Sequence, residues 1–286
     1  MAQGEGEGPR RCRAGGGAHA LTWSQRSVGE AVRAVLLTGD AQAKVMATRA
    51  LVRDWRAGRL DFRFDCAMPH EPARPDRPEL HPARDMPRRG KGGSERGRIA
   101  LWHSLAHIEF TAIDLALDMV GRFGGGMARG FTDDFLSVAA DEAMHYALLD
   151  RKLRTMGSHY GALPAHAGLW EAAQDTRHDV AARLAIVPMV LEARGLDITP
   201  MTLERVRAQG DANGARILSR ILDDEIRHVR FGTKHFVDEV KKRGKTPESY
   251  WQTLVREHFR GRLKPPFNDS ARESAGLSRS FLDGIA

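Results

Sequence analysis

The sequence is poor in cysteine and lacks long apolar runs. Its 286 residues include two cysteines, Cys12 and Cys66, which lie in irregular stretches and form no CxxC motif. This excludes a disulfide framework and is typical of a reducing compartment. No apolar run approaches the roughly 18 residues that cross a bilayer, and the basic N-terminus lacks the apolar segment of a signal peptide. We therefore expect a cytoplasmic protein with no membrane segment.

An excess of positive charge is confined to the first third of the chain. Residues 1–100 hold 19 Lys and Arg against 12 Asp and Glu, whereas the remaining 186 residues hold 25 of each. The excess indicates either a solvated arginine-rich surface or an attraction for an anionic substrate such as RNA. The basic stretch 84–98 has no aromatic residue for base stacking, so the nucleic-acid signal is weak.

Sustained strand alternation is also missing, and the sequence predicts an all-α protein. Ser27, Asp40 and Thr132 are the expected N-caps of three helices, and Gly195 is the expected end of another. Helices are expected at 26–38, 40–57, 95–122, 132–156, 169–194, 200–208, 212–243 and 247–259.

Three parts are expected along the chain. Residues 1–94 combine a disordered N-terminus (1–20), two short helices and the proline-rich stretch 61–93, which we expect to wrap the rest without regular structure. Such a long irregular stretch is unusual in a compact domain and favours a role such as draping over a site. Residues 95–245 form the predicted four-helix bundle, and 246–286 add a helix and a tail.

Two helices share an internal repeat in which acids and histidines interrupt the apolar stripe. FLSVAADEAMHYALL (135–149) aligns with LSRILDDEIRHVRFG (218–232), and both contain Asp-Glu-x-x-His. The Glu and His fall on the 3-4-3-4 spacing of the buried face of a bundle helix. The repeated residues are Asp141, Glu142 and His145 in the first copy, and Asp224, Glu225 and His228 in the second.

A further glutamate precedes each repeat by 33 residues. These are Glu109 and Glu192, and each has an aspartate five residues further on. Two such helix pairs, related by a pseudo-twofold axis, would bring four carboxylates and two imidazoles together, because Glu and His at i and i+3 share a helix face. This ligand chemistry suits iron or manganese, and two divalent ions would balance the four carboxylates. The alternative is a metal-free bundle with solvated acids.

The arrangement resembles the ferritin-like di-iron carboxylate proteins, in which two helices give one Glu each and two others give Glu-x-x-His. The resemblance covers about residues 95–240 and implies a ferritin-like four-helix bundle with extra N-terminal and C-terminal helices. HSLAHIE, DEAMHY, LEARGLDITP and DDEIRH also resemble an uncharacterised bacterial ferritin-like family, similar in plan to rubrerythrins and tRNA-modifying di-iron hydroxylases. The implied metal ligands are Glu109, Glu142, His145, Glu192, Glu225 and His228.

Several neighbours of these ligands have expected roles. Asp141 and Asp224 each precede a ligand histidine by four residues, where they either orient its ring or lie partly exposed. Pro188 should kink its helix one turn before Glu192. His103 and His107 are expected to be ordinary packed or exposed histidines, with a redox or proton relay as the alternative.

The resemblance implies an oxidoreductase. Two Fe ions (or Mn/Fe or Mn₂ pairs) would activate O₂ or peroxide to oxidise or hydroxylate an organic substrate, with Glu142 and Glu225 as bridges. The run that contains Arg227 also resembles the motif of oxygen-activating di-iron enzymes, in which the Arg belongs to an outer ion-pair network. Because no CxxC pair is present, we expect an external electron donor. The expected substrate is a small molecule, with RNA as an alternative, and a homodimer is compatible with the sequence.

Two rival functions remain open at this point. The first is a metal-binding or storage protein with ferroxidase activity and no organic substrate. The second is a structural helical interaction module, which would bind no metal.

Overall fold

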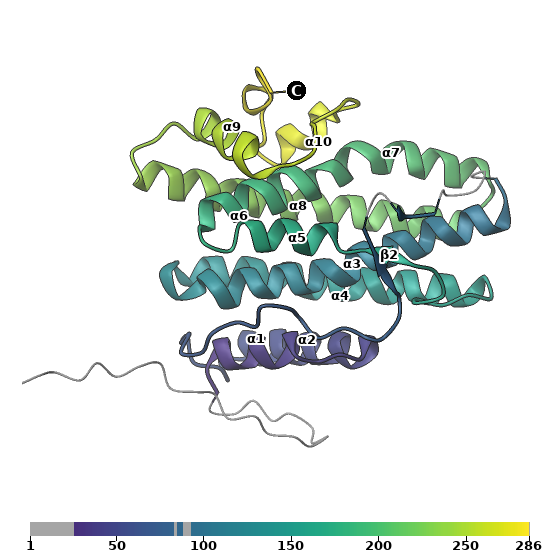
Figure 1. Cartoon of the computed structure of the whole chain (residues 1–286), viewed down its shortest axis with the longest axis horizontal. Helices are drawn as coiled ribbons and strands as arrows, with labels where there is room; N and C mark the ends of the chain where they lie inside the picture. Colours follow the sequence, from purple (N-terminus) through teal and green to yellow (C-terminus); the bar gives the residue numbers. More distant parts are fainter. Residues whose placement is uncertain (1–25, 83–84, 88–92, 286) are drawn as a thin grey trace, which may run out of the picture.

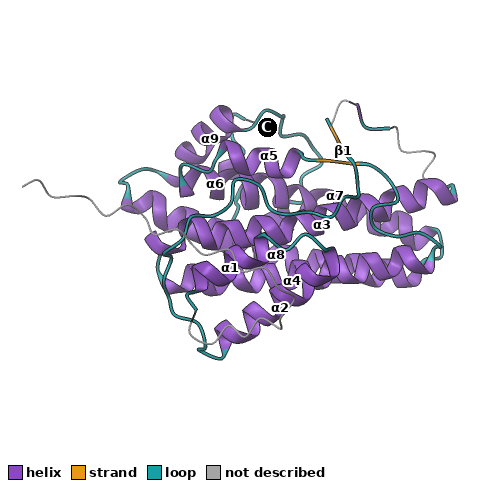
Figure 2. Cartoon of the chain, turned by 60° about the horizontal axis from the view of Figure 1, so that its bottom comes forward, coloured by secondary structure: helices purple, strands orange, loops and turns teal. Residues whose placement is uncertain are grey.

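The computed structural model describes residues 26–82, 85–87 and 93–285, and in this part the chain is an all-α helical bundle. The expected disordered stretch 1–20, with Cys12, lies outside the described residues, as does part of the basic stretch 84–98. Within the described residues, the only strands are β1 (Leu80–His81) and β2 (Ala165–His166), which pair in parallel (Figure 2). The part of the chain that the structure describes holds no helix long and apolar enough to span a membrane.

The helices follow the chain in the order drawn in Figure 1, with a π-helical stretch at Val187–Glu192. Short 3₁₀ turns lie at Gly124–Gly126 and Arg279–Phe281. The helices are α1 (Val28–Leu36), α2 (Ala41–Arg56), α3 (Glu95–Phe123), α4 (Arg129–Thr155), α5 (Gly168–Asp175), α6 (Val180–Ile186), α7 (Ala193–Ala208), α8 (Ala212–Lys242), α9 (Pro247–His258) and α10 (Asp269–Ser274).

Two long helix pairs build the bundle. Helix α3 packs along α4, α7 and the π-helical stretch pack on α8, and α4 and α8 contact one another between the pairs. Helices α1 and α2 cover α3 and α4, whereas α9 and α10 pack on α6, α7 and α8. The two terminal regions therefore lie on opposite sides of the bundle, in purple and yellow in Figure 1.

The first two N-caps agree with the sequence, but the third expectation was wrong. Ser27 forms a capping box with Glu30, and the Asp40 side chain accepts from the backbone N–H of Ala43 at 2.7 Å. Helix α4 instead begins at Arg129, and Thr132 lies buried inside its first turns. The helix starts earlier because Phe131 is completely buried, which draws the first turn onto the core.

The helix expected at 169–194 is divided, and its expected end at Gly195 was wrong. The chain breaks between α5 and α6, then continues through the π-helical stretch into α7, which runs past both Gly195 and Pro200. Pro200 has no N–H to donate to the carbonyl of Leu196, four residues earlier. The side-chain amide of Asn268 donates to that carbonyl instead, at 3.1 Å, so the helix continues without an unsatisfied acceptor.

The distortion expected at Pro188 is present as the π-helical stretch, which ends at Glu192. Pro188 packs against Gly232 of α8, where a Cβ atom would lie 2.3 Å from the proline Cβ. Only a glycine fits at this distance, so the π-helical stretch and α8 depend on each other. Since π-helical segments commonly occur at functional sites, the place of this one beside an expected ligand is informative.

Candidate metal centre

The two Asp-Glu-x-x-His motifs face each other across the α4–α8 interface. Every inward position expected from the repeat is buried, and His145 and His228 have no exposed surface. The ligand atoms of four residues lie within 4.8 Å of one another. These four are Glu109, Glu142, His145 and Glu225. The fold therefore brings together side chains that are up to 116 residues apart in sequence (109 to 225).

Glu142 lies between the two histidines. Its Oε2 is 3.4 Å from Nδ1 of His145, and its Oε1 is 3.0 Å from Nδ1 of His228. Glu109 lies beside His145, with Oε2 at 3.1 Å from the same Nδ1. Glu225 lies beside His228, with Oε1 at 3.6 Å from Nδ1. The arrangement has two halves, each with one histidine and one outer carboxylate, and Glu142 is common to both.

Several of these buried atoms have no hydrogen-bond partner among the described residues. They are both carboxylate oxygens of Glu142, Oε2 of Glu225 and Nδ1 of His228. The 3.0 Å approach of Glu142 to His228 therefore brings the atoms close without the alignment of a hydrogen bond. An unpaired buried polar atom is unfavourable. Close atoms that converge without bonding are what a shared cation requires of its ligands.

Glu192 is placed differently from Glu109, although the repeat makes them equivalent. Glu192 closes the π-helical stretch, is only half-buried, and is not one of the four clustered residues, whereas Glu109 stands on the continuous helix α3. It is nevertheless close enough to Glu225 and Glu142 for their charges, together with burial, to raise its pKa well above the usual range. The π-helical stretch changes the helical register and accounts for this asymmetry.

Asp141 and Asp224 do contact the ligand histidines, but each contacts the histidine of the other helix. Nε2 of His145 is 3.1 Å from Oδ2 of Asp224, and Nε2 of His228 is 3.3 Å from Oδ2 of Asp141. The sequence placed each aspartate with the histidine of its own helix. The exchange follows from the antiparallel packing of α4 and α8, which sets each Asp opposite the partner helix's His. Arg227 donates to both aspartates, at 2.6 and 3.1 Å, and so forms the expected outer ion pairs.

Comparison with known protein families identifies the family of this chain. The family described as "Protein of unknown function (DUF455)" matches residues 37–283. This chain belongs to the DUF455 family. An uncharacterized protein of Haemophilus influenzae is 41% identical over 217 residues, which cover 74% of this chain and 75% of the relative. No solved structure matches the chain.

The pKa shifts at this DUF455 site are those of acids and histidines crowded together in a buried position. Burial would lower the pKa of His145, but the carboxylates of Asp224, Glu109 and Glu142 close to its ring raise the pKa well above its usual range. Burial and the neighbouring charge of Glu142 raise the pKa of Glu109. Protons would compete for the same atoms with any metal ion that binds here, so such binding would depend on pH.

His103 and His107 are packed histidines, as expected. Both are buried on the opposite side of α3 from Glu109, about 120° and 160° away from it around the helix. Nδ1 of His107 accepts from the Tyr160 hydroxyl at 3.0 Å, and its Nε2–H donates to the carbonyl of His166 at 3.0 Å. These two contacts use both ring nitrogens, so His107 is a structural element of the wall outside the metal centre.

Sequence reasoning missed two buried cations beside the centre. Lys44 of α2 contacts Asp114, and Arg272 of α10 contacts Asp197. The equal spacing of the two aspartates from Glu109 and Glu192 was visible in the sequence, but their partners lie in distant segments. Asp197 also contacts Arg194 of its own helix at 3.4 Å, but Arg272 binds both of its carboxylate oxygens at 2.8 Å.

Proposed function

We propose that this DUF455 protein is a di-metal carboxylate oxidoreductase that uses two iron ions to activate O₂ or peroxide and oxidise an organic substrate. The observation that carries the proposal is the set of buried ligand atoms without hydrogen bonds, centred on Glu142. Mn/Fe and Mn₂ pairs would use the same oxygen and imidazole ligands.

The spacing of the ligand atoms fits a shared ion. Two donor atoms about 2.1 Å from one ion, at right angles to each other, lie about 3.0 Å apart. Nδ1 of each histidine lies 3.0 to 3.6 Å from its carboxylate neighbours. Glu142 would be common to both ions, with His145 and Glu109 holding one, and His228 and Glu225 holding the other. Glu225, expected from the sequence as a second bridge, is assigned to one ion because it lies 3.6 Å from Nδ1 of His228. Glu192 would complete the second half, as the repeat predicts.

The charge balance supports two ions rather than one. Glu109, Glu142 and Glu225 are buried, and Glu192 is half-buried beside them. Isolated buried carboxylates are very unfavourable when ionised. Two divalent cations would cancel the four negative charges, and redox-active ions would supply the electrons that reduce O₂ or peroxide.

Asp224 and Asp141 would orient the histidine rings for metal binding. A carboxylate accepts, so Asp224 holds a proton of His145 on Nε2. Asp141 does the same for His228. Nδ1 of His145 contacts Glu109 at 3.1 Å and would offer its lone pair to an ion once its own proton has left. Each Nδ1 is on the side of the glutamates.

Arg227 pairs with both aspartates, and Arg220 pairs with Asp224 at 2.6 Å. Arg227 helps to lower the pKa of Asp141, and Arg220 helps to lower that of Asp224, so both carboxylates stay ionised.

The test is metal content followed by anaerobic Fe(II) loading and exposure to O₂. We expect about two ions per chain, with O₂ consumed as Fe(II) is oxidised. Glu142→Gln should lose at least one ion, whereas Glu204→Gln, at an exposed position on α7, should keep both. Undiminished two-ion stoichiometry in Glu142→Gln, or no stoichiometric uptake by the native chain, would remove the basis of the proposal. Added organic substrates that change the oxygen stoichiometry would separate an oxidase from a ferroxidase.

A further inference from the structure

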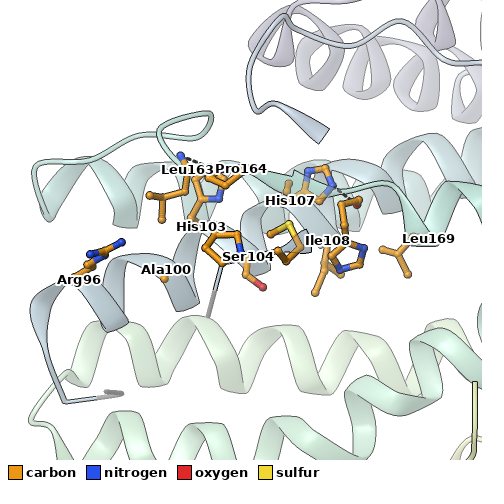
Figure 3. Close-up of a pocket in the computed structure, with 13 residues that line it drawn as sticks. Arg96, Ala100, His103, Ser104, His107, Ile108, Leu163, Pro164 and Leu169 are labelled. Carbon is orange, nitrogen blue, oxygen red and sulfur yellow. Dashed lines mark hydrogen bonds between the residues drawn. The ribbon is translucent and has the colours of Figure 1, made fainter. Parts of the chain in front are cut away.

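A cavity of about 320 Å³ lies on the outer face of α3, away from the metal centre (Figure 3). Its floor is α3, its far wall is the stretch 163–169, and Met86 and Pro87 of the proline-rich stretch close one side. The pairing of β1 with β2 fastens the proline-rich stretch beside this wall. His107 lines the cavity and is about 160° from Glu109 around the helix, so the cavity and Glu109 occupy opposite faces of α3.

The size and lining are those of a small-molecule site. Ligand pockets typically measure about 300 to 1,000 Å³ and combine apolar walls with a few placed polar groups. The walls here are mainly apolar, with Ile108, Leu163 and Leu169 among them. In Figure 3, Arg96 and Leu169 stand at opposite ends of the lining, and His103 lies between them. The lining therefore has its arginine at one end and Leu169 at the other.

The histidines of the lining are held in defined tautomers. The backbone N–H groups of Gly161 and Leu163 point to Nε2 of His103, at 3.0 and 3.4 Å. Because Nε2 accepts, the neutral ring carries its proton on Nδ1. Burial lowers the pKa of His103 to about 4, so the ring is neutral at physiological pH. His166 accepts from Gly168 N–H through Nδ1 at 3.2 Å, which places its proton on Nε2.

The polar lining is rich in donors and free of acids. Arg96 offers a guanidinium group, and His103 and His166 each carry one ring N–H not used in these contacts. None of the described residues that line the cavity carries a carboxylate. A cavity with this lining favours an anionic or acceptor-rich group and disfavours a cation.

We propose that this cavity binds a small organic acid, with the carboxylate near Arg96 and His103 and the apolar body against Ile108 and Leu169. The site is independent of the metals and goes beyond the proposed oxidation. It is also preorganised, because Tyr160 and the His166 carbonyl fix both nitrogens of His107 in the same wall. The side-chain ordering needed when the acid binds would then fall mainly on the exposed Arg96.

The test is calorimetric titration of the full-length protein with hexanoate and benzoate, compared with the neutral hexanamide and benzamide. The acids should bind, and the amides should bind at least tenfold more weakly, a difference of about 1.4 kcal/mol. Equal binding of acids and amides would overturn the anion-binding assignment. Absence of acid binding at millimolar concentration would overturn the site itself.

Substitutions locate the binding. Arg96→Gln, at an exposed position, should weaken acid binding about tenfold, whereas Arg98→Gln, on the same helix but outside the lining, should not change it. Ala100→Trp should fill the cavity and abolish binding of acids and amides. Acid binding that survives Ala100→Trp unchanged would contradict the proposal. Because these tests measure binding and not turnover, they succeed or fail independently of the metal centre.

Discussion

The ammonium group of Lys44 lies 2.5 Å from Oδ1 of Asp114, and both side chains are buried. Asp114 follows the ligand Glu109 by five residues, and its counterpart Asp197 is held in the same way by Arg272. Two buried ion pairs thus join the terminal helices to the helices that follow Glu109 and Glu192. Lys44 joins α2 to α3, which carries Glu109, and Arg272 joins α10 to α7, which follows Glu192 directly. The terminal helices therefore support the bundle next to the centre.

Lys44→Met should destabilise the protein by about 3 to 5 kcal/mol, because it leaves the buried Asp114 without its cation. Urea unfolding measures this loss. Lys234→Met, which breaks the surface pair with Asp134, is the matched control and should cost about 1 kcal/mol or less. The double variant Lys44→Met with Asp114→Leu should recover much of the loss, since the unpaired charge is removed. A loss for Lys44→Met no larger than the control would contradict this account.

Gly232→Ala should destabilise the protein by about 1 to 3 kcal/mol, because the new Cβ would collide with the rigid ring of Pro188. Gly195→Ala is the control: nothing lies within 4 Å of its Cβ position, so it should gain up to about 1 kcal/mol from helix propensity. Thermal unfolding separates the two variants. We also expect Gly232→Ala to lower metal occupancy, because the π-helical stretch positions Glu192. A stabilising effect at Gly232 would mean that α8 and the π-helical stretch separate easily.

Asp224→Asn should weaken metal binding about 10- to 100-fold, as is usual when the partner of a ligand histidine is changed. Because Asp224 contacts His145, the effect should fall on the ion held by His145 and Glu109. Competition with a chelator measures the affinity, and a double-mutant cycle should show coupling of Asp224 with His145 and little with His228. Exposed Asp223→Asn is the matched control and should leave affinity unchanged.

The buried His103 should make the fold sensitive to acid. Its pKa is lowered to about 4 in the fold, against 6.5 for the ordinary group, so the unfolded chain binds more protons between these values. The free energy of unfolding is therefore unaffected by His103 above pH 6.5. It falls as the pH is lowered toward 4, by up to about 3 kcal/mol. His103→Gln should flatten this slope relative to the native chain in urea unfolding at each pH. His178→Gln, at an exposed position, should keep the native slope.

The helical bundle and the clustered Glu and His residues could be predicted because both follow from the spacing of residues within single helices. The 3-4-3-4 stripe fixed which face of α4 and α8 is buried, and the repeat pointed to His145 and Glu142. The contact of Asp141 with His228, rather than with His145 of its own helix, could not be predicted, because it depends on the antiparallel register of α4 and α8. Likewise, the sequence predicts a helix end at Gly195. The helix continues because Asn268, from a distant segment, donates to the carbonyl of Leu196, which Pro200 cannot bond.

The π-helical stretch limits how far the repeat extends. The two halves match in residue spacing, so sequence alone made Glu109 and Glu192 equivalent. A register change within one helix leaves spacing in sequence untouched and alters only the direction of a side chain. The cavity beside His103 could not be predicted from the sequence either, because its lining comes from three separate segments: α3, the proline-rich stretch and residues 163–169.

The contact between His145 and Asp224 can form only after both helices have been synthesised. Asp224 follows His145 by 79 residues, so a ribosome that adds about 5 to 20 residues per second delivers it roughly 4 to 16 seconds later. During that interval the first helix pair has a histidine whose ring nothing from α8 can orient. An ion captured early would meet only the side chains of the first helix pair, with His145 held by Glu109 and not yet by Asp224. The centre is therefore a late product of translation, assembled when the second helix pair docks on the first.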